Sequence, residues 1–432
     1  MKVIDHVGTA QTVTYLPPEV LELIIDHLRH RRRPIAAQKD LWACCLVAKE
    51  WYETTIKHLY DAPVLSPRNF TEFAITLSPR VASRVRRVGL EDFVQHLDMG
   101  SLAYESKKST TARLISRTKN SLRTFVAPAV SFSTTSLAPL SRCSRLEYLD
   151  LSRDSYDFKL VQLMRSIKSI RNLTWLSLPK DCIAHYHDSV YKPLEQQGQE
   201  FWPIMLQSLQ LNEHHFEPTA WQWKALLASL PPVLTNLSFR NCTSYDAFDH
   251  VAVADQIVPQ VKTLVISVNR GDDTYYLNQL VKPFPNITKL TVPAITSWIF
   301  KNFIFMSTEN SWSLTASNTN TATPPQQMEV LVLEQSPDFV SSTHITVESL
   351  RQFVTHCPKL VRIEVPEAYF NVEEDEDYQM DLLNESLTKR AEELTDSVKL
   401  SICPDQVGIY TTQSNPNLGV GLKRSFIYRA EG

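Results

Sequence analysis

Histidine and cysteine are the residues of this chain with the clearest capacity for metal or nucleophilic chemistry. Two histidine pairs occur, His185 with His187 and His214 with His215. A structural zinc site needs about four nitrogen or sulfur ligands at short spacing. The two pairs stand apart in the chain, and none of the seven cysteines forms a Cys-x-x-Cys pair. We interpret these histidines as surface residues and expect neither a metal nor another cofactor.

Cys143, in "SRCSRL", is the candidate nucleophile that we consider for an enzyme. No partner base is marked in the sequence, and buried unreactive cysteines are common. The phosphate-binding and nucleophile-elbow motifs, which depend on glycine, are absent, and the chain has nine glycines. We therefore predict a protein that is not an enzyme. A pocket with converging titratable groups would be needed to support an enzyme instead.

The charge balance gives no general reason to expect nucleic-acid binding. The chain carries 44 basic and 47 acidic side chains, a net charge of −3. "RHRRR" (29–33) is a local basic run that would suit a nuclear signal or a phosphate contact, but we predict a solvated loop. An odd number of cysteines and no long apolar run favour a reduced, cytoplasmic or nuclear protein without a membrane span.

A recurrent triad, apolar-x-x-apolar-x-apolar, organises most of the chain. Eight clear copies follow one another at intervals of 26 to 41 residues, and weaker copies begin at Val85 and Leu122. In the copy "LEYLDL" (146–151), Leu149 and Leu151 are two apart and point to the same side of a strand. The eight clear copies begin at Leu146, Leu173, Leu206, Leu234, Val261, Ile287, Met328 and Leu360.

The segments between triads place apolar residues at helical spacing, for instance in 158–170, 220–230 and 347–360. Alternation of strand and helix at this period predicts a parallel sheet on one face and helices on the other. One such unit cannot bury its own apolar face, so neighbouring units must stack. An ordinary α/β domain with buried strands is the alternative.

Residues 80–370 resemble leucine-rich repeats of the long, irregular kind. The resemblance implies an α/β solenoid, a horseshoe with about eight to ten repeats, a concave parallel sheet and convex helices. Insertions are expected at 185–200 and 303–327, and an acidic segment with a capping helix near 385–394 is expected within residues 371–432. The side chains that alternate with the buried ones should face the concave side and contact a target protein. These are Tyr148, Asp150, Ser152, Trp175, Ser177, Gln210, Asn212, Arg240, Lys289, Thr291, Arg362 and Glu364.

The N-terminal region is predicted to form a small helical module after a tail at residues 1–13. Pro17 and Pro18 suit the first turn of a helix, and apolar residues recur at helical spacing from Val20 to Leu28. "LPPEVLELIIDHL" followed by "DLWACCLVAKEWYETTIKHLY" resembles an F-box over residues 14–62. Ala48 stands where that family usually has cysteine, and the loop before Asp40 is longer than usual. Residues 63–79 then form a linker helix.

The F-box resemblance implies binding to the Skp-type adaptor of a cullin–RING ubiquitin ligase. The chain would be a substrate receptor whose repeats hold an unknown protein for proteasomal degradation. A non-catalytic repeat scaffold that acts outside degradation is the alternative, and neither nucleic acid nor membrane is an expected partner. The adaptor-binding residues expected from the resemblance are Leu16, Pro17, Pro18, Glu19, Val20, Ile24, Leu28, Leu41, Leu46 and Trp51.

Overall fold

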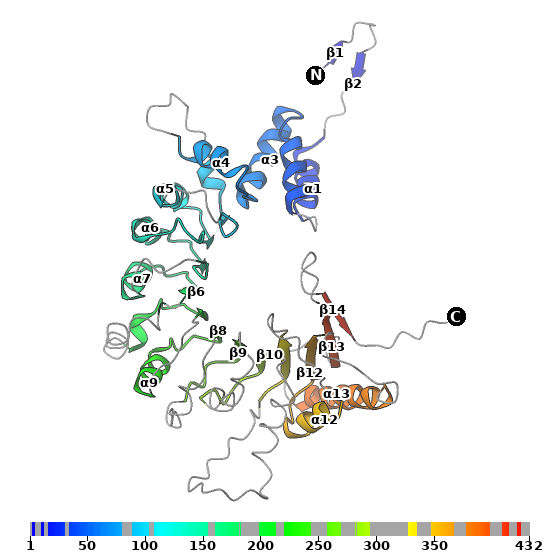
Figure 1. The fold of residues 1–432 in the computed structure, drawn as a ribbon. Coiled ribbons are helices and arrows are strands. Elements are labelled where there is room, and N and C mark those ends of the chain that lie inside the picture. The colour runs from blue at the N-terminus through cyan, green and yellow to red at the C-terminus, as the bar shows by residue number, and fades with distance from the viewer. Residues whose placement is uncertain are drawn as a thin grey trace, which may run out of the picture. The chain divides into compact units, whose positions relative to one another are not determined.

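The structure is a computed structural model of the chain and divides into two compact units, residues 1–157 and 158–432. The described residues are 2–4, 10–12, 16–30, 34–79, 89–102, 108–153, 160–180, 182, 198–212, 220–242, 257–268, 281, 283–293, 327–334, 347–366, 377–397, 408–413 and 421–424. The fold is an α/β solenoid preceded by a helical module (Figure 1).

The first unit begins with an antiparallel pair, β1 (Lys2–Ile4) and β2 (Ala10–Thr12), followed by three packed helices. These are α1 (Pro18–Arg29), α2 (Pro34–Cys44) and α3 (Lys49–Asp61). Pro18 begins α1, where its missing N–H costs no helical hydrogen bond, and Glu19 lies at the positive end of the helix dipole. The core of the module is small and consists mainly of Leu21, Ile25, Ala37 and Leu41.

Hydrogen bonds join this module to the repeats that follow it. The Gln38 side chain accepts a bond from the Val64 backbone N–H at 2.6 Å. The linker helix α4 (Phe70–Leu77) follows, and the Ser101 hydroxyl donates to the Leu65 carbonyl at 3.1 Å. The Gln95 N–H donates to the Asp61 carbonyl at 3.0 Å, so the end of α3 connects directly to the residue before the first described strand of the repeats, His96–Asp98.

The repeats of the first unit consist of three short parallel strands with helices between them. The order is η1 (Leu90–Phe93), β3 (His96–Asp98), α5 (Lys108–Thr118), β4 (Thr124–Val126), α6 (Thr134–Leu140) and β5 (Tyr148–Asp150). Leu97, Phe125 and Leu149 are in register on neighbouring strands and are fully buried. Their stacking continues one apolar core from repeat to repeat.

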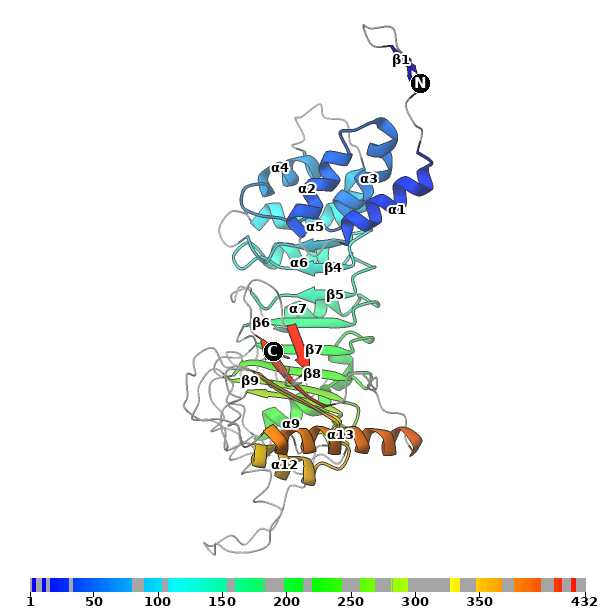
Figure 2. The ribbon, with the colours of Figure 1, turned by 90° about the vertical axis from the view of Figure 1, so that its right-hand side faces the viewer.

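The second unit extends the same design over eight parallel strands, each paired with the next, and ends with the antiparallel β14 (Figure 2). Its strands are β6 (Trp175–Lys180), β7 (Ser208–Asn212), β8 (Asn236–Cys242), β9 (Thr263–Val268), β10 (Lys289–Pro293), β11 (Val330–Glu334), β12 (Arg362–Pro366), β13 (Gly408–Gln413) and β14 (Gly421–Arg424). The described helices of this unit are α7 (Leu160–Ile167), η2 (Gly198–Phe201), α9 (Ala220–Ser229), α12 (Val347–His356) and α13 (Asp377–Ser397).

The structure confirms the predicted fold class. Every one of the eight clear triads leads into a strand, and each strand begins two residues after its triad does. The first residue of the triad packs in the turn before the strand, as Leu146 does before β5, where it is fully buried. In the second unit the helices lie on one side of the sheet (Figure 1).

The ends of the array differ from the prediction. The weak triad expected at Val85 lies largely outside the described residues, whereas "VQHLDM" (94–99), a matching triad that the sequence analysis overlooked, forms β3. At the other end, β13 continues the parallel sheet beyond residue 370, where only a cap and tail were expected. The capping helix is longer than expected and spans α13.

Arg390, on α13, closes the carboxyl end of α12. Its Nη1 donates to the carbonyls of Val354, Cys357 and Leu360 at 3.1, 2.9 and 3.2 Å. The last carbonyls of a helix have no partner within that helix, and a cation is favourable at this end. Burial lowers the pKa of Arg390 and raises the pKa of the neighbouring Cys357 thiol to about 12, so this thiol is neutral at physiological pH.

We predict that Arg390→Leu destabilises this end of the array by about 2 kcal/mol, because it leaves three carbonyls without their donor. Hydrogen exchange of the amides of α12 measures the effect locally, since a repeat array need not unfold in one step. Lys389→Leu, at the exposed neighbouring position, is the matched control. Equal exchange rates in the two variants would contradict the capping role of Arg390.

Candidate protein-binding surfaces

The helical module exposes an unusual share of apolar side chains. Residues 16–61 supply eight of the sixteen large apolar side chains that are exposed in the described part of the chain. Single exposed apolar residues are normal on a protein surface, but a concentration of them indicates a surface for another protein. The eight are Leu16, Val20, Leu23, Ile35, Trp42, Leu46, Val47 and Tyr52.

Helix α1 presents two apolar faces. Leu21 and Ile25, four residues apart, are buried in the module. Val20 and Leu23 lie outside that face, and Leu23 is 71% exposed. The predicted contact residues Ile24 and Leu28 are half-buried between the two faces, whereas Leu16, Pro17, Pro18 and Glu19 are exposed at the start of the helix.

Helix α2 and the turn after it divide in the same way. Leu41 is buried with Leu21 and Ile25, so the structure places this predicted adaptor contact in the core and not on the surface. Its neighbour Trp42 is 58% exposed, and Leu46 and Val47 in the turn are 66% and 62% exposed. Trp51, on α3, is half-buried.

Five of the exposed apolar residues are not among the predicted adaptor contacts, namely Leu23, Ile35, Trp42, Val47 and Tyr52. The single apolar stripe predicted along α1 accounts for the buried side of that helix and not for its exposed apolar residues. For Leu23, the only one of the five on α1, the available signal was the number of apolar residues around that helix, which exceeds what one buried face requires.

Charged pairs hold α1 against α3. Arg29 forms an ion pair with the buried Asp61, and Lys57 forms one with Glu22. The hydrogen bond from Lys57 lowers the pKa of the Glu22 carboxyl. His58 lies near these groups, and its Nε2 is buried without a hydrogen-bond partner among the described residues. Burial first, then the charges of Lys57 and Arg29, lower the pKa of His58 against the opposing effect of Glu22 and Asp26.

We predict that the module loses stability as the pH falls below about 6.5, the ordinary pKa of histidine. The unfolded chain takes up a proton at His58 in this range, while the folded module, with its lowered pKa, resists protonation. The contribution is therefore present above pH 6.5 and is lost toward lower pH. Hydrogen exchange of the amides of residues 1–157 in the full chain, measured as the temperature rises, reports the stability of this unit. That stability should depend less on pH in His58→Gln than in the unchanged chain. An unchanged pH dependence would contradict this.

In the first unit, the predicted concave residues Tyr148, Asp150 and Ser152 are all half-buried. The Asp150 carboxylate, at the end of β5, accepts a hydrogen bond from the Ser152 N–H at 2.8 Å. The Asp98 carboxylate, at the end of β3, accepts one from the Gly100 N–H in the same way. These aspartates therefore form turns at the ends of their strands. Burial, Asp150 and Asp98 raise the pKa of Tyr148 to about 12, so its hydroxyl remains protonated.

In the second unit, several predicted contact residues bind one another instead of facing solvent. Ser177 and Asn212 are buried. The Asn212 amide donates to the Ser177 hydroxyl at 3.0 Å and to the Leu178 carbonyl at 2.8 Å. It also accepts a bond from the Gln210 amide at 3.1 Å. These hydrogen bonds satisfy the buried side chains of Ser177 and Asn212. Gln210 is half-buried and is the accessible residue of the three.

A second network crosses the sheet farther along the array. Arg240 Nη1 donates to Ser267 Oγ at 2.9 Å and to Glu334 Oε2 at 3.0 Å, and Ser267 donates to the same carboxylate at 2.8 Å. The three residues come from β8, β9 and β11. On β10, the strand between β9 and β11, Pro293 is the residue in register with Glu334, and it brings no polar side chain to the network. Ser267 and Glu334 were not among the predicted site residues.

The remaining predicted concave residues differ in exposure. Thr291 is buried, and Arg362 and Glu364 form a nearly buried ion pair at 2.8 Å on β12. Lys289 is exposed and Trp175 is half-buried. We correct the predicted contact set accordingly: Ser177, Asn212, Thr291, Arg362 and Glu364 are structural in this unit. The accessible members in the second unit are Trp175, Gln210, Arg240 and Lys289.

The histidine pairs and most of the basic run lie outside the described residues, whereas Cys143 lies within them. The histidines at 185, 187, 214 and 215 lie outside the described residues, and so do Arg31, Arg32 and Arg33. In the residues that are described, no group of three potential ligands could hold a metal ion, and no helix is long and apolar enough to cross a membrane. Cys143 is buried, and burial raises its pKa to about 12, which makes it a poor nucleophile.

No protein-family model matches the chain. The chain is similar to the F-box protein YDR306C of Saccharomyces cerevisiae, with 27% identity over 274 residues, 60% of this chain and 51% of that protein. It is also similar to Protein pof5 of Schizosaccharomyces pombe, with 24% identity over 289 residues, 66% of this chain and 76% of that protein. One of these two fungal proteins is thus named as an F-box protein.

The predicted F-box resemblance agrees with the similarity to the F-box protein YDR306C, and the predicted repeats agree with the strands and helices described above. The match spans about half the length of the F-box protein YDR306C. Among solved structures the chain is similar to the LRR protein LIC12759 of Leptospira interrogans, at 12% identity over 64% of this chain and 62% of that one, with a TM-score of 0.26. The repeat fold is shown by the strands and helices described above.

Proposed function

We propose that this chain is the substrate receptor of a Skp–cullin–F-box ubiquitin ligase. The observation that carries the proposal is the concentration of exposed apolar side chains on the helical module that precedes a repeat array. Similarity to the F-box protein YDR306C supports the same assignment. In this role the chain holds a target and a recruited enzyme modifies it, so the chain itself catalyses nothing.

The Skp-type adaptor would cover the apolar residues that the module leaves exposed. Trp42 lies in the last turn of α2 and Leu46 and Val47 in the turn that follows it, while Val20 and Leu23 lie on α1. Buried aromatic side chains commonly dominate the binding energy of an interface, so Trp42 is the expected anchor. Leu41 contributes indirectly, because its burial fixes the position of α2.

The repeats would hold the target protein through the accessible part of the sheet face. In the second unit, Trp175 and Lys289 combine aromatic surface with charge, a mixture typical of protein interfaces. The first unit contributes the half-buried Tyr148. Arg240 contributes a guanidinium that is 36% exposed while Ser267 and Glu334 hold it in place. The proposed place of action is the cytoplasm, the nucleus or both, and proteasomal degradation of the target is the proposed outcome.

We predict that Trp42→Ala weakens binding of a Skp-type adaptor by about tenfold or more, because it removes the largest exposed apolar side chain of the module. The double change Leu16→Ala with Pro17→Ala should also weaken it. Titration calorimetry with purified adaptor measures both, and Ile75→Ala, an exposed apolar residue on α4, is the control. Full affinity in both variants would refute the adaptor surface.

We predict that proteins captured by the full chain accumulate when cullin activity is blocked, and that this accumulation requires residues 1–62. Affinity purification followed by mass spectrometry, with and without those residues, measures it. Trp175→Ala with Lys289→Glu should reduce target capture and leave adaptor capture unchanged. Captured partners whose abundance does not respond to cullin inhibition would favour the alternative, a repeat scaffold outside degradation.

A further inference from the structure

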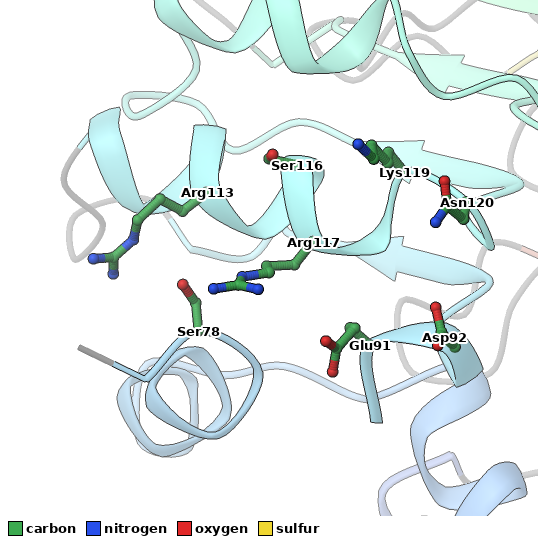
Figure 3. A pocket seen from close by; sticks show the side chains of 8 residues that line it. All are labelled: Ser78, Glu91, Asp92, Arg113, Ser116, Arg117, Lys119 and Asn120. Carbon is green, nitrogen blue, oxygen red and sulfur yellow. The ribbon is translucent and has the colours of Figure 1, made fainter. Parts of the chain in front are cut away.

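A cavity of about 480 Å³ lies in the first unit (Figure 3), and none of its lining residues belongs to the surfaces described above. Its walls come from the end of α4, from η1, from α5 and from the turn after α5. The lining residues are Ser78, Glu91, Asp92, Arg113, Ser116, Arg117, Lys119 and Asn120. Small-molecule sites have volumes of roughly 300–1,000 Å³ and are mostly apolar. This cavity has a suitable size but a polar lining, so it suits a strongly polar ligand.

The positive charges in the cavity come from α5 and the turn after it. Arg113 and Arg117 are four residues apart and therefore lie on one side of the helix. Both side chains lie at the end of the cavity nearest Ser78, the residue that follows α4 (Figure 3). Lys119 lies toward the opposite end (Figure 3). Within the part of the chain that the structure describes, none of these three cations forms an ion pair.

Helix geometry explains only some of these charges. Arg117 and Lys119 lie at the carboxyl end of α5, where a cation is favourable by itself. Arg113 stands in the middle of the helix, so the helix dipole gives no reason for a cation there. An arginine pair with unoccupied donors matches a planar or tetrahedral oxyanion, which two guanidinium groups can bind through several charge-assisted hydrogen bonds.

Glu91 and Asp92 give the cavity a second, opposite charge. They extend from η1, across the cavity from α5 (Figure 3). A ligand that carried only negative charge would gain at the arginines and lose at these carboxylates. A ligand that carries both an anion and a cation would gain at both places. Charge complementarity therefore selects a ligand of mixed charge.

We propose that this cavity binds a phosphate monoester whose body also carries an amine or another cation. Arg113 and Arg117 would hold the phosphate, and Glu91 and Asp92 would hold the cation. The proposal is independent of adaptor binding. The same chemistry occurs in a free small molecule and in a phosphorylated peptide with a nearby basic residue, and the experiment distinguishes these two sources.

Calorimetric titration of the full chain with four probes tests the site. The probes are O-phosphoethanolamine, inorganic phosphate, a short peptide with phosphoserine and lysine, and the same peptide without phosphate. We expect O-phosphoethanolamine or the phosphopeptide to bind more tightly than inorganic phosphate, and the unphosphorylated peptide not to bind. Tighter binding of O-phosphoethanolamine would indicate a free small molecule, and tighter binding of the phosphopeptide would indicate a peptide source.

Substitutions then separate the two ends of the cavity. Arg113→Gln and Arg117→Gln should each weaken the better probe about tenfold or more, the effect of losing a charge-assisted contact. Asp92→Asn with Glu91→Gln should weaken that probe but leave inorganic phosphate equal or tighter. Arg142→Gln, an exposed arginine of the same unit outside the cavity, is the control. Thermal unfolding confirms that each variant is folded, and Arg113→Lys should retain part of the affinity.

Several outcomes would overturn the proposal. These are an absence of saturable binding by any probe, equal affinity in wild type and the two arginine variants, and equal binding of the phosphorylated and unphosphorylated peptides. A loss of affinity in Arg142→Gln as large as that in Arg113→Gln would show a general charge effect and would overturn it as well.

Discussion

The stacking of incomplete repeats is the constraint on which most of this structure depends. Each triad supplies about three apolar side chains, and one strand with one helix cannot remove them from water alone. Leu97, Phe125 and Leu149 show the solution, since register aligns them in neighbouring strands and each is fully buried. Burial of such a side chain contributes roughly 1.5–3 kcal/mol, but only while its neighbours are in place. The backbone pairing of the strands follows from this need for stacking.

The same alignment determines the other face of the sheet. If buried residues of adjacent strands are in register, the residues between them are also in register, and short polar side chains come within hydrogen-bonding distance. Asn212 reaches Ser177 where the register between β6 and β7 shifts, since Ser177 itself pairs with Gln210. Arg240 likewise reaches Ser267 where the register between β8 and β9 shifts. A polar group that is covered by its neighbours must be hydrogen-bonded, because an unpaired one costs about 1–3 kcal/mol. Part of the sheet face therefore stabilises the array, and only the remaining part is available for a partner.

This explains what the sequence could predict. Apolar periodicity is local and repeated, so the eight triads located eight strands, and Pro17 with Pro18 located the start of α1. Alternation placed Tyr148 and Lys289 away from the core, and in the structure Tyr148 is half-buried and Lys289 is exposed. It could not distinguish Lys289 from Thr291, because exposure depends on the size and polarity of side chains from adjacent strands. The continuation through β13 escaped notice because "GIYTTQ" lacks the full triad.

The helical module presents the opposite situation from the repeats. Its apolar residues exceed what three short helices can bury, and it has no identical neighbour on which to stack. Leu21, Ile25 and Leu41 use the available interior, while Leu23, Trp42 and Leu46 remain outside. Ion pairs such as Arg29 with Asp61 hold the helices together without covering these side chains. Modules of this size often need a partner to complete their core. The excess apolar surface that makes the module poorly suited to stand alone is therefore the property that suits it to bind an adaptor.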